Sequence, residues 1–349
     1  MAYLGTAISL FSGAGGLDLG AEKAGFAVRG AVEYDRDAAL TMEKNFVGLA
    51  SGVIRKSILD VPTSTILQEA GLGRRESPEL LIGGPPCTPF SKSGFWLEWK
   101  REGLDPVASL LQEYTRVLRE ARPTYFLLEN VAALAFNNRA SRPAFTRLLR
   151  EIDEAGYGFS WKVLSAADYG VPQARSRLII LGARKGLPIP QHPAATHGTE
   201  HEPHVTAGVA LAGLESVAED EEIVGGRWGH MLPEIAPGDN YLHFTEKRGH
   251  PNPQFEWRSR YWSFLLKLDP QRPSPTIQAQ PGPNVGPFHW EDRRLRVPEL
   301  RRLFTFPDDF QFVGSRRAVQ AQIGNSVPPL FAEALLKDIA GVSAESAAA

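Results

Sequence analysis

Short apolar runs alternate with helix-like stretches through the first half of the chain, and this alternation limits the folds available to it. The runs are short enough for buried strands and cover residues 7–11, 27–33, 80–82, 125–129 and 178–181. Helical spacing of apolar residues lies between them, at 36–45, 106–120 and 142–155. Such alternation predicts an α/β fold with a mainly parallel sheet that helices cover on both faces.

The character of the sequence changes after Lys185. A segment rich in Gly, Pro, His and acidic residues follows, with scattered Trp and Arg. A helical pattern returns at 328–339, and the small residues of 343–349 predict a disordered tail. We therefore expect a larger domain made of residues 1–187 and 315–349, and a smaller, irregular domain of residues 188–314.

Composition excludes several classes of protein. The 349 residues include one cysteine, which excludes an internal disulfide framework, and the chain has no cysteine spacing typical of a metal site. His192, His197, His201 and His204 are loosely spaced, so we interpret them as solvated loop residues and expect no metal site. The start of the chain has no signal-like character and no apolar stretch is long enough to span a bilayer, so a cytoplasmic location is expected.

The formal net charge of −2 hides a local asymmetry. The ionised residues of 200–222 are all acidic, whereas basic residues predominate over 247–317. A basic surface of this kind is compatible with phosphate contacts. A solvated face balanced by nearby carboxylates explains the same charges, so charge alone does not identify a nucleic-acid partner.

A glycine-rich turn, Phe11-Ser12-Gly13-Ala14-Gly15-Gly16, follows the first predicted strand and opens a helix. Glu33 lies about twenty residues on, at the end of the second strand, where an acidic side chain commonly accepts ribose hydroxyls. Asp60 could cap an adenine amino group or be an ordinary loop aspartate. The nucleoside-cofactor residues predicted here are Phe11, Ser12, Gly13, Gly15, Gly16, Glu33 and Asp60. The turn is short of the full dinucleotide spacing, and it leaves NAD and S-adenosylmethionine both open.

The single cysteine, Cys87, ends the segment Gly83-Gly84-Pro85-Pro86-Cys87 after an apolar run. Two glycines let the backbone pass close to a ligand, and two prolines restrict the backbone just before the sulfur. A thiol held at the carboxyl end of a strand suits nucleophilic catalysis. A small buried hydrophobic residue is the alternative for any isolated cysteine.

Five motifs occur in one order along the chain. They are 11–16 (FSGAGG), 85–87 (PPC), 129–131 (ENV), 173–177 (QARSR) and 322–329 (QIGNSVPP). In order and rough spacing they resemble the DNA (cytosine-5)-methyltransferases, over the whole chain except roughly residues 190–265. The resemblance implies a Rossmann-like, S-adenosylmethionine-dependent methyltransferase sheet with a smaller target-recognition domain, and double-stranded DNA as substrate.

The resemblance also assigns chemical roles. The Cys87 thiolate would add to C6 of cytosine and so activate C5 for methylation. Glu129 would hold N3 and the exocyclic amine, Arg177 would point at O2, and Arg175 would support the region of the nucleophile. Because C5 is inaccessible inside a duplex, the base must first be flipped out.

The same resemblance completes the cofactor site and suggests the DNA contacts. Pro85, Asn325 and Val327 would join the cofactor residues. Residues 88–101 resemble a mobile catalytic loop, in which Ser91 and Lys92 would contact DNA. Thr88 stands where many family members have glutamine, which leaves open what fills the gap left by the flipped base. Candidate base-reading residues in the variable segment 188–271 are Arg227, Arg258 and Arg260.

Other functions remain open at this point. An RNA cytosine methyltransferase of the tRNA type shares the catalytic motifs. A nicotinamide-dependent oxidoreductase would use the glycine turn and Cys87 but leaves Arg175, Arg177 and Asn325 unexplained. An inactive binding module is a third alternative, but the intact Cys87 and Glu129 argue against it. For the methyltransferase we expect a monomer, associated with the nucleoid, that is either solitary or paired with a restriction endonuclease.

Overall fold

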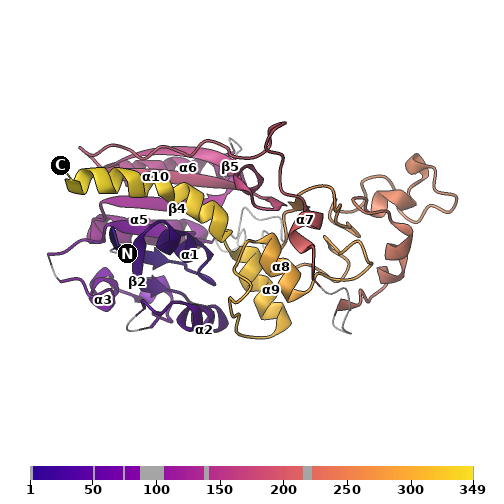
Figure 1. The fold of residues 1–349 in the computed structure, drawn as a ribbon, viewed down its shortest axis with the longest axis horizontal. Helices are drawn as coiled ribbons and strands as arrows, with labels where there is room; N and C mark the ends of the chain where they lie inside the picture. Colours follow the sequence, from indigo (N-terminus) through magenta and orange to yellow (C-terminus); the bar gives the residue numbers. More distant parts are fainter. Residues whose placement is uncertain are drawn as a thin grey trace.

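The sheet that organises the molecule has six strands in the order β2-β1-β3-β4-β7-β5 (Figure 1). The computed structural model describes residues 3–49, 52–73, 75–86, 106–136, 141–214 and 222–348. The strands are β1 (Gly5–Leu10), β2 (Phe26–Val32), β3 (Leu80–Gly83), β4 (Tyr125–Val131), β5 (Tyr157–Ser165) and β7 (Ser176–Arg184). Strands β1 to β4 are mutually parallel, which confirms the predicted mainly parallel α/β sheet.

Two features of the sheet depart from the sequence prediction. Strand β7 runs antiparallel to both of its neighbours, β4 and β5. Strand β5 is absent from the prediction because it is an edge strand, with most of its side chains half-buried or exposed and no continuous apolar run. Periodicity identifies buried strands more readily than strands of this kind.

Helices cover both faces of the sheet (Figure 1). One core packs β1–β4 against α1 (Gly16–Lys23), α2 (Arg36–Asn45) and α10 (Pro329–Ala348). The other packs them against α3 (Thr63–Glu69), α5 (Pro106–Ala121) and α6 (Arg142–Glu154). Neighbouring residues of β1 divide between the two cores, Ala7 in one and Ile8 in the other, as strand alternation requires.

The prediction of a disordered tail is wrong, because α10 continues to Ala348. Its first turns are anchored by buried Phe331, Leu335 and Ile339. The tail is rich in alanine, the residue with the highest helix propensity, so it extends a helix that is already nucleated.

The remaining elements are short. They are β6 (Gln173–Ala174), β8 (Ser274–Pro275), α7 (Ala207–Leu211), α8 (Val297–Leu303), α9 (Arg316–Asn325) and the one- or two-turn helices η1 (Ile58–Asp60), η2 (Ala132–Ala135), η3 (Ala166–Tyr169), η5 (Gly229–Glu234), η6 (Tyr241–Phe244) and η7 (Glu246–Arg248). Helices α8 and α9 pack on the core of the sheet. Residues 222–265, which we call the lobe, lie away from the sheet (Figure 1), and they form with Phe288 a separate small core.

Candidate active site

The carboxyl ends of β1, β3 and β4 meet at one edge of the sheet. Leu10 pairs with Gly83, and Gly83 pairs with Leu128. The glycine turn after β1, the Gly84-Pro85-Pro86 segment after β3 and the end of β4 are therefore neighbours. Ligands of open α/β sheets bind at such an edge.

A buried ion pair joins two of the predicted catalytic residues. The Arg177 Nε lies 2.7 Å from Glu129 Oε1, and the two side chains are 13% and 11% exposed. Val131 pairs with Arg177 and Glu129 with Ile179, so Glu129 and Arg177 are diagonal neighbours across the β4–β7 ladder. Burial lowers the pKa of the Arg177 guanidinium, and the Glu129 carboxylate opposes that effect. Antiparallel β7 thus places a fixed positive charge against a carboxylate in a protected site.

The chain before Cys87 passes directly against this carboxylate. A Cβ on Gly84 would lie 2.8 Å from Glu129 Oε2, so only glycine fits there without displacement. Asn130 Nδ2 donates to the Pro85 carbonyl at 2.9 Å, and Asn130 Oδ1 accepts from the Val131 N–H at 2.9 Å. The sequence marks Asn130 only as a member of the 129–131 motif. The structure shows that it ties β4 to the segment that leads to Cys87.

Cys87, Ser91 and Lys92 lie outside the described residues, as do Thr88 and the rest of the predicted catalytic loop. Their places in the site remain predictions.

Arg175 is buried and contacts the last turn of α9 and the residue after α8. One of its terminal nitrogens, Nη2, donates to the Gly324 carbonyl at 2.9 Å, and its guanidinium carbon lies 5.2 Å from the centre of the Phe304 ring. Burial lowers the pKa of Arg175 well below its ordinary value, neighbouring Arg177 adds to the shift, and Glu129 opposes it. Arg175, two residues before Arg177, therefore ties this stretch of the chain to the end of α9.

The glycine turn after β1 combines open space with close packing. Gly13 has φ 56° and Gly15 has φ 83°, in the left-handed region that favours glycine. A Cβ on Gly13 would meet no described atom within 4 Å, whereas one on Gly15 would lie 2.5 Å from the Phe46 ring. A Cβ on Gly16 would lie 2.2 Å from the Val327 carbonyl oxygen. The turn is thus packed on one side by α2 and the Val327 segment, and it leaves room beside Gly13.

Glu33 closes the turn from the end of β2. Its Oε2 accepts the Gly13 N–H and its Oε1 accepts the Asp35 N–H, each at 2.7 Å. Burial raises the pKa of Glu33, and these backbone bonds oppose the rise. Each carboxylate oxygen can accept a second hydrogen bond. Glu33 is therefore oriented by the turn and retains capacity for ribose hydroxyls.

The other predicted cofactor residues differ in exposure. Ser12, Pro85 and Val327 are buried, Phe11 is half-buried with φ 53°, and Asp60 and Asn325 are exposed. The Val327 carbonyl lies against Gly16 of the glycine turn. No described contact joins Asp60 to the turn.

The predicted base-reading arginines are exposed in the lobe. Arg227 stacks over the Trp228 ring at 4.6 Å. Arg258 has φ 58°, an unusual conformation for a non-glycine residue. Arg260 lies 5.9 Å from the ring centres of both Phe255 and Phe264, so its guanidinium also packs on the lobe core.

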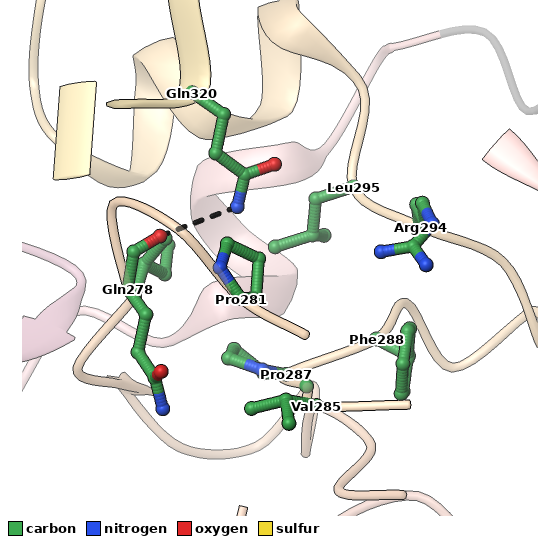
Figure 2. A pocket seen from close by; sticks show the side chains of 10 residues that line it. Gln278, Pro281, Val285, Pro287, Phe288, Arg294, Leu295 and Gln320 are labelled. Carbon is green, nitrogen blue, oxygen red and sulfur yellow. Dashed lines mark hydrogen bonds between the residues drawn. The ribbon is translucent and has the colours of Figure 1, made fainter. Parts of the chain in front are cut away.

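Figure 2 shows a narrow recess between α9 and residues 277–295, where Gln320 of α9 donates to the Gln278 carbonyl at 3.3 Å. Pro281, Pro287 and Leu295 are among the side chains that line it. None of the predicted site residues lines this recess. The recess lies where residues 277–295 pack against α9.

An unexpected carboxyl lies beneath the glycine turn. Asp18, in the first turn of α1, is fully buried, and no described group meets hydrogen-bond geometry with either of its carboxylate oxygens. Burial raises its pKa to about 7, although the neighbouring Ser9 hydroxyl opposes part of the rise. The helical pattern of the sequence gives no indication that this aspartate faces inward.

A parallel sheet with one inserted antiparallel strand, a glycine turn after β1 and an acidic residue after β2 define a Rossmann-like methyltransferase. The model of one family, C-5 cytosine-specific DNA methylase, matches residues 5–341, and the chain belongs to that family. It is an enzyme, a DNA cytosine-5 methyltransferase, as the motifs predict. The family uses S-adenosylmethionine as methyl donor.

Relatives match over most of their length. The chain is 46% identical to the Type II methyltransferase M.SacI of Streptomyces achromogenes, over 92% of this chain and 89% of the relative. It is 32% identical to M.XorII of Xanthomonas oryzae pv. oryzae, over 94% and 82%. These matches do not favour the RNA, oxidoreductase or binding-module alternatives.

Solved structures share the fold. A DNA modification methyltransferase encoded within an E. coli prophage superposes with a TM-score of 0.71 at 24% identity, covering 97% of this chain and 99% of that one. A variant of DNMT2 from Spodoptera frugiperda gives 0.62 at 17% identity, over 96% and 99%. No helix in the described part of the chain is both long and apolar enough to cross a membrane.

Proposed function

We propose that this enzyme is the modification methyltransferase of a Type II restriction system and that it methylates a flipped-out cytosine through a covalent adduct between Cys87 and C6. The buried Glu129–Arg177 pair carries the proposal, because it stands beside the segment that leads to Cys87. Full-length similarity to Type II methyltransferases supports the biological setting.

The residues of the site match the charge changes of this reaction. Addition of a thiolate to C6 moves electron density onto C5 and toward N3. Glu129 supplies or shares a proton at N3 and binds the exocyclic amine, and Arg177 stabilises the negative charge that develops near O2. Fixed charges in a protected site stabilise such a transition state more strongly than water does, because they need no reorganisation. Asn130 contributes by holding the Pro85 carbonyl, two residues before the nucleophile.

The glycine turn fits S-adenosylmethionine, which supplies an electrophilic methyl group when bound. The open space at Gly13 admits the ligand, and Glu33 offers lone pairs to the ribose hydroxyls. Phe11, Ser12, Gly15, Gly16, Pro85, Asn325 and Val327 form the rest of the proposed pocket, with Asp60 at the adenine. Arg175 joins this side to the catalytic side through the Gly324 carbonyl.

Recognition of duplex DNA is assigned to the lobe and to the loop after Cys87. Arg227, Arg258 and Arg260 are exposed and available to base edges or phosphates, and Ser91 and Lys92 would contact the strand around the flipped base. Both sets belong to one chain, so a monomer suffices. A restriction endonuclease that cuts the same unmodified site is the expected partner, and bacterial DNA places the enzyme in the cytoplasm at the nucleoid.

Trapping the adduct tests the proposal. Bisulfite sequencing of DNA from cells that express the chain gives the recognition site. Duplexes with 5-fluorocytosine at that site, incubated with enzyme and S-adenosylmethionine, should become cross-linked to Cys87, as read by denaturing gel and peptide mass spectrometry. Cys87→Ala should bind S-adenosylmethionine normally and form no cross-link.

Two results would overturn the proposal. One is methylation by Cys87→Ala, which would exclude the covalent step. The other is cross-linking of 5-fluorocytosine-containing tRNA in preference to duplex DNA, which would reassign the substrate.

A further inference from the structure

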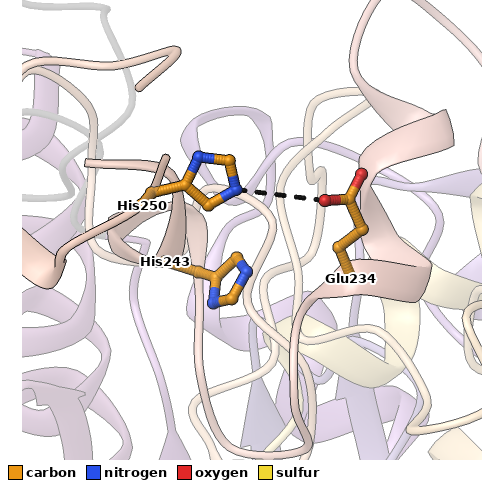
Figure 3. Close-up of side chains that lie close together, drawn as sticks. All are labelled: Glu234, His243 and His250. Carbon is orange, nitrogen blue, oxygen red and sulfur yellow. Dashed lines mark ion pairs between the residues drawn. The ribbon is translucent and has the colours of Figure 1, made fainter. Parts of the chain in front are cut away.

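Two histidines and a carboxylate converge in the lobe, outside the active site. Glu234 ends η5, His243 lies in η6, and His250 follows η7 by two residues. Their ligand atoms all lie within 4.8 Å of one another. Figure 3 shows the His250 ring directed at the Glu234 carboxylate, with the His243 ring beside it.

His250 is oriented as metal-binding histidines commonly are. Its Nδ1 lies 2.9 Å from the Asn252 carbonyl oxygen. The Asn252 N–H approaches the same nitrogen at 3.2 Å, so Nδ1 can also act as an acceptor. In the shorter contact a protonated Nδ1 donates to the carbonyl oxygen, and this tautomer leaves the lone pair on Nε2 for a metal ion. The Nε2 faces Glu234 Oε2 at 4.0 Å. A backbone carbonyl that fixes the tautomer in this way is a frequent outer partner of a metal ligand.

His243 offers the second imidazole. Its ring is half-buried and packs edge-on against His250, with the ring centres 5.3 Å apart. It also contacts Phe244, a residue of the lobe core. No described residue hydrogen-bonds to its ring nitrogens. A half-buried imidazole with free nitrogens, facing another imidazole and a carboxylate, is available to a cation.

We propose that Glu234, His243 and His250 bind one divalent transition-metal ion, with zinc as the preferred ion. Imidazole and carboxylate are ordinary zinc ligands, and a water molecule would complete a tetrahedral site. In such a site, zinc–ligand distances near 2.1 Å place neighbouring ligand atoms about 3.4 Å apart. The exposed Glu234 side chain can close the remaining distance by rotation, because nothing in the described structure buries it.

The position of the cluster explains what the ion would do. Residues 222–265 contain only one- or two-turn helices around a small apolar core, an arrangement with little regular hydrogen bonding to stabilise it. An ion held from η5, η6 and the turn after η7 would cross-link these three segments, and binding energy of this kind adds to folding energy. The cross-link would hold the segment that leads to Arg258 and Arg260 and would give the lobe a structural metal centre.

Zinc binding by the full chain tests the proposal. Protein stripped with chelator and dialysed should take up one zinc per chain in isothermal titration calorimetry, and zinc should raise its melting temperature. Glu234→Gln removes one ligand from the surface without risk to the core, and we expect about tenfold weaker binding. His243→Ala and His250→Ala should each lose the site. His230→Ala is the matched control, because His230 is exposed in η5 but outside the cluster, and it should bind zinc as the wild type does.

Specific outcomes would overturn the assignment. Equal zinc uptake by the wild type and by a folded His243→Ala would place the ion elsewhere, for example on Cys87. No uptake by the wild type would leave His250 and Glu234 as an ion pair only.

Discussion

Glu129 occupies the position where one residue most affects the proposed chemistry. It contacts Arg177, lies against Gly84 and sits beside Asn130, which holds Pro85. Glu129→Gln keeps the shape of the side chain but removes its charge and its capacity to exchange a proton. We expect the rate constant of methyl transfer to fall about a hundredfold or more, the usual scale for losing a positioned acid or base. Single-turnover assays with tritiated S-adenosylmethionine measure this.

Two further measurements accompany that assay. Affinity for S-adenosylmethionine should be unchanged in Glu129→Gln, since the role proposed for Glu129 is to bind the cytosine and not the cofactor. A variant with near-normal turnover would remove Glu129 from the mechanism.

The burial of Asp18 predicts that the unfolding free energy depends on pH. Its pKa is raised by burial from 3.8 to about 7, so the folded state holds this proton more tightly than the unfolded state does. The stabilisation that follows is fully present below about pH 3.8 and is lost as the pH rises through about 7. At 1.36 kcal/mol per unit of pKa, this single group should remove about 2 to 3 kcal/mol of unfolding free energy between pH 5 and pH 8.

Asp18→Asn isolates this contribution, because it mimics the neutral carboxyl at every pH. Urea unfolding at pH 5 and pH 8 should show that the variant gains stability relative to the wild type at the higher pH. A constant difference between the two proteins across that range would show that Asp18 titrates with an ordinary pKa.

At the scale of elements, the glycine turn depends on the contact between the start of α1 and the segment after α9. A Cβ on Gly16 would lie 2.2 Å from the Val327 carbonyl oxygen, which is backbone and cannot rotate away. Gly16→Ala should therefore cost about 1–3 kcal/mol of stability and weaken S-adenosylmethionine binding about tenfold. Chemical unfolding and calorimetry measure the two effects.

Gly341→Ala is the matched control for that variant. Gly341 lies in α10, and a Cβ there would meet no described atom within 4 Å. Alanine is favoured over glycine inside a helix, so this variant should be unchanged or more stable by up to about 1 kcal/mol. Equal effects of the two substitutions would mean that the Gly16–Val327 contact is unimportant.

At the scale of the whole molecule, a buried ion pair helps to join the lobe to α8, which packs on the core of the sheet. Arg293 pairs with Ile223 at the edge of the lobe, and its guanidinium donates to both oxygens of Glu299 in α8, at 2.8 and 2.9 Å. Burial acts to raise the pKa of Glu299, but the bonds from Arg293 and the Arg296 N–H lower it overall. His289 lies beside the pair, and burial lowers its pKa to about 4, so it is neutral at pH 7.

Glu299→Gln removes the buried partner of Arg293 and leaves only the Glu291 carboxylate, which is 40% exposed, beside the guanidinium. We therefore expect a loss of about 3 kcal/mol in unfolding free energy, the low end of the cost of breaking a buried pair. Affinity for cognate DNA should fall as well, because the lobe is then less firmly placed. Glu154→Gln is the control, since it breaks only an exposed pair with Arg150 at 3.7 Å, and it should change stability by less than about 0.5 kcal/mol. Similar losses in both variants would contradict a joining role for the Arg293–Glu299 pair.

Much of the fold and of the candidate site follows from local pattern. Buried strands β1 to β4 and helices α2, α5 and α6 are visible as periodic runs because each buries apolar side chains on defined faces. The edge strand β5, the antiparallel direction of β7 and the helical tail of α10 are not visible in this way. The two strands depend on which neighbouring strands they pair with, and the helical tail depends on the helix that it continues.

The sequence by itself determined the family, the enzyme class and the order of the chemical motifs, because these reside in residue types at short spacing. The tertiary structure alone decided that Arg177 reaches Glu129, that Asn130 holds Pro85, that Asp18 is buried, and that Glu234, His243 and His250 converge. Each of these depends on strand register or on the packing of distant segments, and such through-space contacts leave no periodic pattern along the chain.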